Sequence, residues 1–439
     1  MPENGTDSQE SMLPRLRARL AMSLARPEVA AAAAGLNARI RFETEAGACD
    51  ILVKDGVGTV DNAPGAPDIT ISAPSAAWIA ALDPIPRPGF QSFTAWQISN
   101  PSFTVSGEPL IIAQARPFLE VLVENLRPHV PQAEAPTPRS FEGIAGRYHL
   151  VARPSGLRCP IYAETAGDGQ PLLCLHTAGA DSRQYHGLLT DLGLRKAWRI
   201  IAFDMPFHGR SLPTPDWVGA RYALDQASYR DWCAAFIEEV VQEPVVLVGC
   251  SMGAAIAMVL AAERPDLVCG LVALEAPVRP RGRRNPYLTH VAVHGGMHSA
   301  AYVRGLMAPS SPTRDRTIAA FIYSQGAPGI YDGDLVFYSD EFDGEEVARR
   351  IDGKRIPTYF LTGRYDYSAT VEDARMLAGW IEGSIMIEMP DLGHFPMVEN
   401  PERFAFYLRP VLDALGGTEK GSTGANKGQG AIPPMTVMR

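Results

Sequence analysis

The pentapeptide Gly-Cys-Ser-Met-Gly at residues 249–253 places a serine where it could act as a nucleophile. It follows the apolar run Val-Val-Leu-Val and precedes Ala-Ala-Ile-Ala-Met-Val-Leu-Ala-Ala-Glu, a segment that favours a helix. At a sharp strand-to-helix turn, flanking glycines leave room for the neighbouring strand and helix, and the serine is exposed at the edge of the sheet. The alternative is a polar residue that only caps a helix. The strand–turn–helix context favours Ser251 as a nucleophile.

A serine hydroxyl needs a base within hydrogen-bond reach to be nucleophilic at neutral pH. His394 lies in the segment Asp-Leu-Gly-His-Phe-Pro after the last apolar run and is the predicted base. Asp366, in Thr-Gly-Arg-Tyr-Asp-Tyr, follows another apolar run and is predicted to fix the imidazole tautomer. The order Ser251, Asp366, His394 is the one expected for a nucleophile turn of this kind.

The oxyanion of a tetrahedral intermediate needs two backbone N–H donors. Met252, directly after the serine, is the predicted first donor. Ala178, in the turn after the apolar run at residues 171–176, is the predicted second donor. His176 is expected to hold this turn rather than to act as a second base, and it is grouped with Thr177 among the candidate substrate contacts.

The elements that would position these side chains are near-continuous apolar runs separated by helical segments. Such runs are typical of parallel strands that are buried on both faces, and their alternation with helices predicts a doubly wound α/β sheet. An antiparallel pair at residues 146–152 and 158–164 would precede the parallel strands. The predicted parallel strands occupy residues 171–176, 199–204, 244–249, 267–275, 357–363 and 384–390.

Residues 142–415 resemble the α/β-hydrolase superfamily, in its capped serine hydrolase branch. The resemblance implies that Ser251 is the nucleophile, Asp366 the acid and His394 the base. Thr177 stands where many members of the superfamily have glycine, whereas dehalogenases and epoxide hydrolases have aspartate at the position of the serine. The matching segments are residues 173–179, 200–211, 246–253, 361–368 and 393–404.

The resemblance also implies that a long insert, at about residues 278–350, forms a helical cap over the active site. Four aromatic residues of the insert could line a pocket that accepts an apolar or aromatic group, or they could pack within the cap. Tyr323 and Tyr338 are the candidate substrate contacts among them, and the other two are Tyr331 and Phe337.

His290, His294 and His298 recur at every fourth residue of the insert, as metal ligands on one helix face would. The pair Gly295-Gly296 falls inside this run and argues against one continuous helix. We therefore expect no metal and no other cofactor. His294 is the histidine of this group that we expect to contact substrate.

Residues 1–127 predict a separate small α+β domain. Helical segments enclose short alternating runs that indicate an antiparallel sheet. The order of these elements resembles sterol-carrier-protein-like domains, which implies an apolar tunnel for a lipid-like ligand. The alternative is a module that mediates dimerisation or covers the entrance of the hydrolase. A proline-rich linker follows at residues 128–141, and a glycine-rich tail at residues 416–439 is expected to be disordered.

The composition describes a globular protein, with 46% hydrophobic and 20% charged residues. A net charge of −9 without a basic block argues against nucleic acid or an anionic membrane as a partner. The six cysteines show no ligand spacing and are expected to be reduced thiols. Because neither a signal core nor a stretch of eighteen apolar residues is present, we expect a cytoplasmic protein without membrane insertion.

The function predicted from these residues is hydrolysis of a carboxylic ester, a lactone or a thioester through an acyl-enzyme. Cleavage of a carbon–carbon bond in a vinylogous diketone, acyl transfer and a non-hydrolytic lyase reaction remain alternatives, because the cap selects the bond that is cleaved. A receptor-like binding protein is a further class. The expected partner is a small, apolar or aromatic substrate, and a homodimer is possible.

Overall fold

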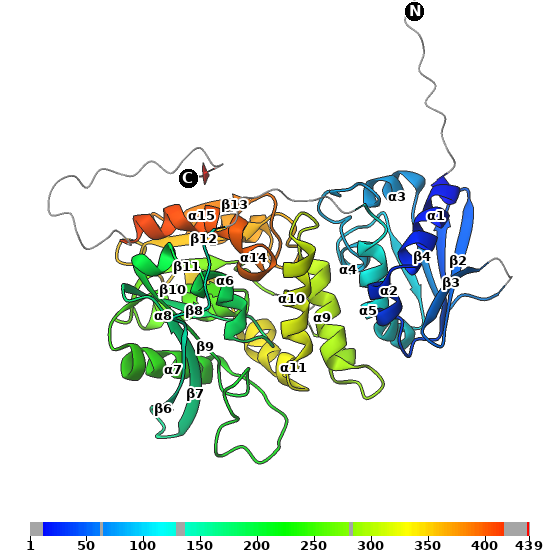
Figure 1. The fold of residues 1–439 in the computed structure, drawn as a ribbon. Coiled ribbons are helices and arrows are strands. Elements are labelled where there is room, and N and C mark those ends of the chain that lie inside the picture. Colours follow the sequence, from blue (N-terminus) through cyan, green and yellow to red (C-terminus); the bar gives the residue numbers. More distant parts are fainter. Residues whose placement is uncertain (1–11, 62–64, 129–136, 281–283, 417–436, 439) are drawn as a thin grey trace, which may run out of the picture. The chain divides into compact units, whose positions relative to one another are not determined.

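The computed structural model describes residues 12–61, 65–128, 137–280, 284–416 and 437–438. The chain divides into two compact units, which are described separately below (Figure 1). Unit 1 comprises residues 1–132 and 291–305, and unit 2 comprises residues 133–290 and 306–439.

Unit 1 contains a five-stranded sheet in the order β3-β2-β1-β4-β5. β1 and β4 are parallel, whereas the other neighbouring pairs are antiparallel, so the prediction of a wholly antiparallel sheet is wrong for this pair. The physical reason is a crossover, because the chain leaves β3 at one edge and pairs next on the far side of β1. The strands are β1 (Ala38–Thr44), β2 (Gly47–Lys54), β3 (Val57–Asp61), β4 (Ile69–Ser72) and β5 (Thr104–Gly107).

The alternation of side chains along β1 explains how this sheet packs. Ile40 and Phe42 are fully buried in the apolar core of the unit. Arg39 and Arg41 point to the opposite face, where both form ion pairs with Asp50, at 3.2 Å and 2.8 Å. The helices that belong to this first stretch of chain are α1 (Met12–Leu24), α2 (Pro27–Ala32), α3 (Ser75–Ala81), α4 (Phe93–Ile98) and α5 (Pro109–Glu124).

Helix α9 (Gly295–Leu306) departs from the predicted domain boundaries, because its residues up to Gly305 belong to unit 1 although they lie inside the predicted cap. The contacts are specific: Arg304 pairs with Glu124 at 2.9 Å, and the Ser92 hydroxyl donates to the carbonyl of Gly305 at 2.8 Å. The helix begins at Gly295, so His290 and His294 precede it and do not share a helix face with His298.

Unit 2 contains a nine-stranded sheet in the order β14-β13-β12-β11-β10-β8-β9-β7-β6. Six neighbouring strands are parallel, in the order β13-β12-β11-β10-β8-β9. Antiparallel strands flank them, with β14 at one edge and β7 and β6 at the other. The strands are β6 (Ala145–Ala152), β7 (Arg158–Ala166), β8 (Gln170–Leu175), β9 (Trp198–Phe203), β10 (Val245–Cys250), β11 (Val268–Leu274), β12 (Thr358–Gly363), β13 (Ile385–Met389) and β14 (Val437–Met438).

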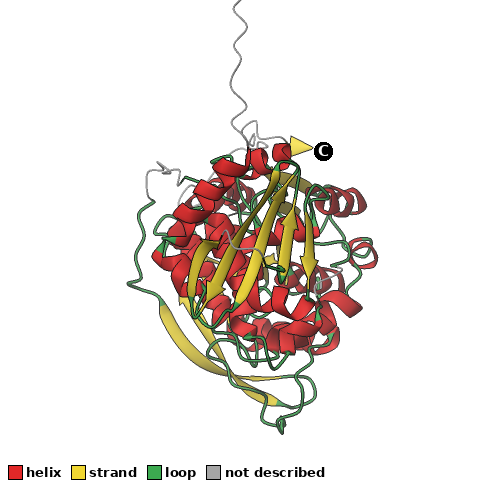
Figure 2. Cartoon of the chain, turned by 90° about the vertical axis from the view of Figure 1, so that its right-hand side faces the viewer, coloured by secondary structure: helices red, strands yellow, loops and turns green. Residues whose placement is uncertain are grey.

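Helices cover both faces of this sheet, which is why its central strands are apolar at every position (Figure 2). In β10, Val245 and Leu247 belong to the core on one face, and Val246 and Val248 belong to the core on the other. The first core contains residues of α7 (Gln226–Phe236), α8 (Met252–Glu263) and α13 (Val371–Trp380). The second contains residues of α6 (His186–Leu189) and α15 (Pro401–Ala414).

The insert between β11 and β12 contributes the short helices of unit 2 that matter for the site. They are α10 (Thr313–Ser324), α11 (Ile330–Leu335), a π-helical turn at Val336–Glu341 and α12 (Gly344–Ala348). The helix α14 (Pro396–Glu399) follows β13.

Most of the predicted disordered tail lies outside the described residues. Val437 and Met438 differ from that prediction, since they pair with β13. In the part of the chain that the structure describes, no helix has the length and apolar character needed to cross a bilayer.

Candidate active site

Ser251 occupies the turn between β10 and α8 in a strained backbone conformation, with φ 56° and ψ −115°. Two glycines make this turn possible. A Cβ on Gly249 would lie 2.1 Å from the carbonyl oxygen of Gly253, and one on Gly253 would lie 2.2 Å from that of Leu175. The backbone N–H of Ser251 donates to the carbonyl of Leu274 at 2.9 Å, which fixes the turn against the neighbouring strand β11.

The insert reaches the serine through Tyr338, in the π-helical turn. The hydroxyl of Ser251 donates to the hydroxyl of Tyr338 at 2.9 Å, and Tyr338 is buried. The structure therefore brings together the predicted nucleophile and one of the predicted substrate contacts. Among the described contacts, the serine hydroxyl bonds to Tyr338 rather than to His394.

His394 and Asp366 form a buried pair at the same edge of the sheet. Nδ1 of His394 lies 2.5 Å from Oδ2 of Asp366, and the two side chains are 1% and 0% exposed. The other carboxylate oxygen of Asp366 accepts from the backbone N–H groups of Ser368, at 2.7 Å, and Ala369, at 3.2 Å. With Nδ1–H directed at the carboxylate, Nε2 is the nitrogen of His394 that can accept a proton.

Backbone contacts hold the His394 loop beside the serine turn. The thiol of Cys250, the residue before Ser251, donates to the carbonyl oxygen of His394 at 3.2 Å. The N–H of His394 donates to the carbonyl of Leu306 at 3.1 Å. Residues far apart in the sequence are therefore fixed against one another next to Ser251.

The two predicted oxyanion donors lie on segments that touch each other. Met252 is the first residue of α8, where a backbone N–H has no partner within the helix. Ala178 lies in the turn after β8. A Cβ on Gly253 would approach the carbonyl oxygens of both Leu175 and His176, so the start of α8 packs directly on the start of this turn.

Thr177 is used to fix the turn after β8. Its backbone N–H and its hydroxyl both donate to Oε1 of Gln184, at 3.1 Å and 3.2 Å. Its hydroxyl also contacts the hydroxyl of Tyr323, on α10. The two predicted substrate contacts Thr177 and Tyr323 are thus buried and bonded to each other.

His176 requires a correction as a substrate contact. Its Nδ1–H donates to the carbonyl of Thr177 at 2.9 Å, and its Nε2 accepts from the N–H of Met205 at 3.2 Å. Burial and, next in size, the neighbouring His208 together lower the pKa of His176 to about 4. The ring is therefore neutral, and both of its nitrogens serve the backbone.

His294 requires a second correction. It is exposed, it belongs to unit 1, and its Nδ1 accepts from the N–H of Met297 in the first turn of α9. Its position inside the insert was the basis for the predicted substrate contact, and this helix-capping role replaces it.

A second buried histidine–aspartate pair, His208 and Asp334, was not predicted from the sequence. Nε2 of His208 lies 2.8 Å from Oδ2 of Asp334, an oxygen that also accepts from the N–H of Gly179 at 2.7 Å. The other carboxylate oxygen accepts from the hydroxyl of Tyr222 at 3.0 Å. Asp334 lies on α11, so this pair fastens the insert to the turn that carries Ala178. Nothing in the sequence around Asp334 indicated this role.

Two buried glutamates near the His394–Asp366 pair were also missed. Both oxygens of Glu275 accept from the N–H of Gly363, at 2.9 Å and 3.1 Å. Glu399 accepts from the N–H groups of Gly393, at 2.7 Å, and Phe395, at 3.3 Å, on either side of His394. A signal was present in both cases, because Glu275 follows an apolar run as Asp366 does, and Glu399 lies in the segment at residues 393–404.

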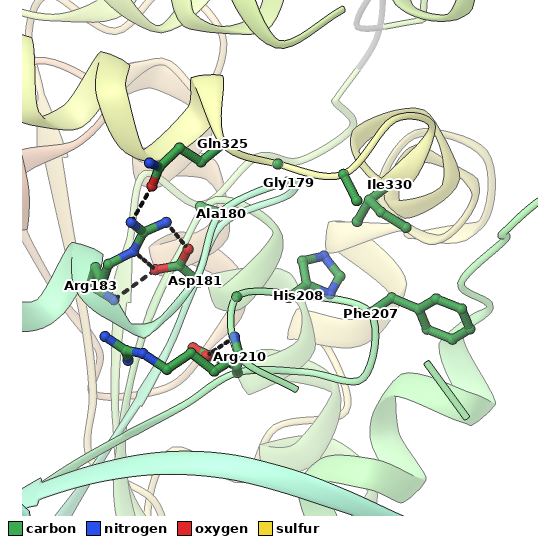
Figure 3. A pocket seen from close by; sticks show the side chains of 13 residues that line it. Gly179, Ala180, Asp181, Arg183, Phe207, His208, Arg210, Gln325 and Ile330 are labelled. Atoms are coloured by element: carbon green, nitrogen blue, oxygen red, sulfur yellow. Dashed lines mark hydrogen bonds and ion pairs between the residues drawn. The ribbon is translucent and has the colours of Figure 1, made fainter. Parts of the chain in front are cut away.

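A pocket of about 280 Å³ adjoins the turn after β8 (Figure 3). On one side Arg183 contacts both Asp181 and Gln325, and on the other Phe207 lies near Ile330. The lining combines carboxylates with guanidinium groups, so its walls favour neither charge. The lining residues are Gly179, Ala180, Asp181, Arg183, Asp204, Phe207, His208, Gly209, Arg210, Gln325, Gly326, Ala327 and Ile330.

Among the described residues, no group of three or more His, Cys, Asp or Glu side chains is arranged to hold a metal ion.

Comparison with known proteins identifies the type of fold. The family model described as alpha/beta hydrolase fold matches residues 170–401, which is more than half of the 439 residues. The chain is 24% identical over 271 residues to the pimeloyl-[acyl-carrier protein] methyl ester esterase of Chromobacterium violaceum, and the match covers 58% of this chain and 98% of that protein. It is 32% identical over 147 residues to the chloroplastic pheophytinase of Arabidopsis thaliana, covering 26% of this chain and 30% of that protein.

A similar solved structure is a thermophilic esterase from Thermogutta terrifontis, with a TM-score of 0.54 and 20% identity. The superposition covers 61% of this chain and 99% of the esterase. At this identity the likeness concerns the fold, and it confirms the predicted fold class.

Proposed function

The chain belongs to the α/β-hydrolase family and is an enzyme, and on this premise we propose that it hydrolyses a carboxylic ester, a lactone or a thioester through an acyl-enzyme on Ser251. His394 is the base and Asp366 is the acid that orients it. Met252 and Ala178 supply the oxyanion donors.

The proposed reaction begins when the hydroxyl of Ser251 turns from Tyr338 to Nε2 of His394. His394 takes the proton as the serine oxygen attacks the carbonyl carbon, and the imidazolium is stabilised by Asp366. The N–H groups of Met252 and Ala178 bind the oxygen that becomes negative. His394 then protonates the leaving group, and a water molecule, deprotonated by the same histidine, releases the acid from Ser251.

The observation that carries the proposal is the buried pair of His394 and Asp366, at 2.5 Å, on a loop bonded to the residue before Ser251. A carboxylate on Nδ1 leaves Nε2 as the basic nitrogen, which is the tautomer that a serine nucleophile requires. The methyl ester esterase among the relatives favours an oxygen ester as the bond cleaved. Tyr338, bonded to Ser251, is the proposed contact to the substrate from the insert, which acts as the cap.

The test is covalent labelling with a fluorophosphonate, followed by hydrolysis of p-nitrophenyl acetate. We expect a single label on Ser251, and Ser251→Ala should lose both the label and about 10⁶-fold in kcat. Ser106→Ala, at an exposed serine on β5, is the matched control and should retain both. Folded wild-type protein that takes no label would exclude the acyl-enzyme and favour a lyase or a receptor.

The ligand of unit 1 stays a separate proposal. The resemblance to sterol-carrier-protein-like domains implies binding of a lipid-like molecule, and the alternative is a structural module. What supports the structural role is that the insert contributes helix α9 to unit 1, where the ion pair of Arg304 with Glu124 and the bond from Ser92 to Gly305 hold it. Binding of a fluorescent fatty acid to the full chain would support the lipid role instead.

A further inference from the structure

Glu275 lies directly after β11, at the edge of the sheet that carries Ser251 and Asp366. Its side chain is fully buried, and its backbone has a positive φ of 49°, a conformation that is unfavourable for a glutamate. Strain of this kind persists where the surrounding structure requires it, and it is common at functional sites. The conformation places the Glu275 carboxyl against the N–H of Gly363, three residues before Asp366.

Glu275 and Asp366 follow the neighbouring strands β11 and β12, and Gly363, at the end of β12, binds Glu275, so the two carboxyl groups come close enough to interact. A carboxylate can only accept hydrogen bonds, so a bond between two carboxyl groups requires a proton on one of them. Asp366 faces the imidazole of His394 and two backbone N–H groups, and these donors favour its anionic form. Glu275 faces one backbone N–H, so the proton resides on Glu275.

A third carboxyl group adds to this preference. Glu399 is fully buried and lies near enough to Glu275 to disfavour a second negative charge there. Burial, followed by the charge of Asp366, raises the pKa of Glu275 well above its ordinary value, and burial raises the pKa of Glu399 to about 7. One imidazole cannot balance three buried carboxylates, which agrees with a neutral Glu275.

We propose that Glu275 is a positioning residue of the acid–base system, whose neutral carboxyl donates a hydrogen bond to Asp366 and so fixes the carboxylate that orients His394. This inference rests on the proposed function. Glu275 touches neither substrate nor Ser251 in the proposed reaction. It acts through Asp366, and the proton that it shares with Asp366 is not transferred to the substrate.

The donated hydrogen bond has a defined effect on His394. It disperses part of the negative charge of Asp366, which lowers the affinity of His394 for a proton. Without this bond, the Asp366 carboxylate attracts a proton on His394 more strongly and can rotate. Loss of Glu275 should therefore slow the reaction and also move the acid limb of the pH profile to higher pH.

The experiment compares Glu275→Gln, Glu275→Met and wild type in kcat, KM and the pH profile of kcat/KM with p-nitrophenyl acetate. Glutamine keeps a donor for Asp366 and an acceptor for Gly363, so Glu275→Gln should stay within about threefold of wild type in kcat, with an unmoved acid limb. Methionine keeps the length and removes both groups, so kcat should fall by about ten- to hundredfold with little change in KM. Glu372→Gln, at an exposed glutamate of α13, is the matched control for the lost carboxyl.

Two results would overturn the role of Glu275. An acid limb that moves to lower pH in Glu275→Gln would show that Glu275 is ionised, because neutralising a carboxylate lowers the pKa of a nearby histidine. A Glu275→Met enzyme with the rate and pH profile of wild type would show that the contact between Glu275 and Asp366 does not affect catalysis. If Glu275→Met fails to fold, the pH profile of kcat/KM for Glu275→Gln alone decides whether Glu275 is neutral. Absence of both labelling and hydrolysis in wild type would instead refute the proposed function, and this inference with it.

Discussion

Unit 2 holds two buried histidine–aspartate pairs that look alike and have different surroundings. His394 lies 2.5 Å from Asp366, and His208 lies 2.8 Å from Asp334, with side chains between 0% and 1% exposed in both pairs. The difference is in the second ring nitrogen of His208. Its Nδ1 lies 3.0 Å from the carbonyl oxygen of Pro206, so both nitrogens of this ring face oxygen atoms and both must donate.

A ring that donates from both nitrogens is a cation and cannot accept a proton. The charge of Asp334 raises the pKa of His208 against the effect of its burial. His208 therefore fastens α11 to the loop after β9, whereas His394 is proposed to transfer protons. A short contact between histidine and aspartate does not identify a catalytic base. For His208, the carbonyl oxygen of Pro206 at the other nitrogen argues for a cation rather than a base.

The largest contrast is expected in turnover. His394→Asn should lower kcat by about 10⁶-fold, because the serine loses its base. His208→Asn should change kcat by less than about tenfold, which is about 1.4 kcal/mol of barrier. Steady-state hydrolysis of p-nitrophenyl acetate at 25 °C measures both, with circular dichroism as the control for folding. Comparable losses in the two variants would end the distinction between the pairs.

The aspartates should show the contrast in two different measurements. Asp366→Asn should lower kcat by about 10⁴-fold, since an amide favours the wrong tautomer of His394. Asp334→Asn should instead lower the free energy of unfolding by about 3–5 kcal/mol, because it leaves a buried imidazolium without its partner. Urea unfolding and kcat, measured on the same preparations, test the assignment. A stable Asp334→Asn protein with a large loss of kcat would contradict it.

The pH dependence of stability offers a smaller contrast. The folded-state pKa of His208 is raised above the unfolded value of about 6.5, so its contribution is fully present below about pH 6.5 and is lost as the pH rises through the folded value. Its charged neighbours are Asp334 and Asp204, and the ring of His176 lies 4.8 Å away. The difference in unfolding free energy between wild type and His208→Gln should therefore be largest at about pH 6 and shrink at higher pH.

His176 provides the internal control for that measurement, because its shift has the opposite sign. Its folded-state pKa is about 4, so the unfolded chain binds its proton more readily, and stability is lost as the pH falls from about 6.5 towards 4. A difference between wild type and His208→Gln that grows with rising pH would contradict a cationic His208.

The central parallel strands of unit 2 could be predicted from the sequence because they are buried on both faces and are therefore mainly apolar, as in β10. The parallel pairing of β1 with β4 could not be predicted, since strand alternation reports burial and does not report direction. Helix α9 was assigned by its place in the chain. Its partners Glu124 and Ser92 are about 180 and 213 residues away in the sequence, and local patterns do not contain such pairings.

The proximity of His394 and Asp366 beside the turn of Ser251 could be predicted, because a residue type, a strand end and an order along the chain coincide there; the catalytic roles of the three residues are proposals. His176 and His294 were assigned by proximity in the sequence, and the structure shows backbone partners at both ring nitrogens of His176 and at Nδ1 of His294. Glu275 satisfies the strand-end criterion as well as Asp366 does. Its proposed role depends on two carboxyl groups that approach each other from the ends of neighbouring strands, a pairing that local sequence patterns do not contain.

The smallest expected effects come from two tyrosine hydroxyls, that of Tyr222 beside the His208–Asp334 pair and that of Tyr338 at Ser251. The hydroxyl of Tyr222 donates to Asp334 at 3.0 Å, so Tyr222→Phe should lower the free energy of unfolding by about 1–2 kcal/mol and leave kcat within about twofold.

The hydroxyl of Tyr338 accepts from Ser251, so Tyr338→Phe releases the serine hydroxyl towards His394. Fluorophosphonate labelling of Ser251 should then become about two- to fivefold faster, in line with about 0.5–1 kcal/mol for a neutral hydrogen bond. Slower labelling would mean that Tyr338 assists the nucleophile rather than restrains it, and the proposed turn of the hydroxyl from Tyr338 to His394 would have to be abandoned.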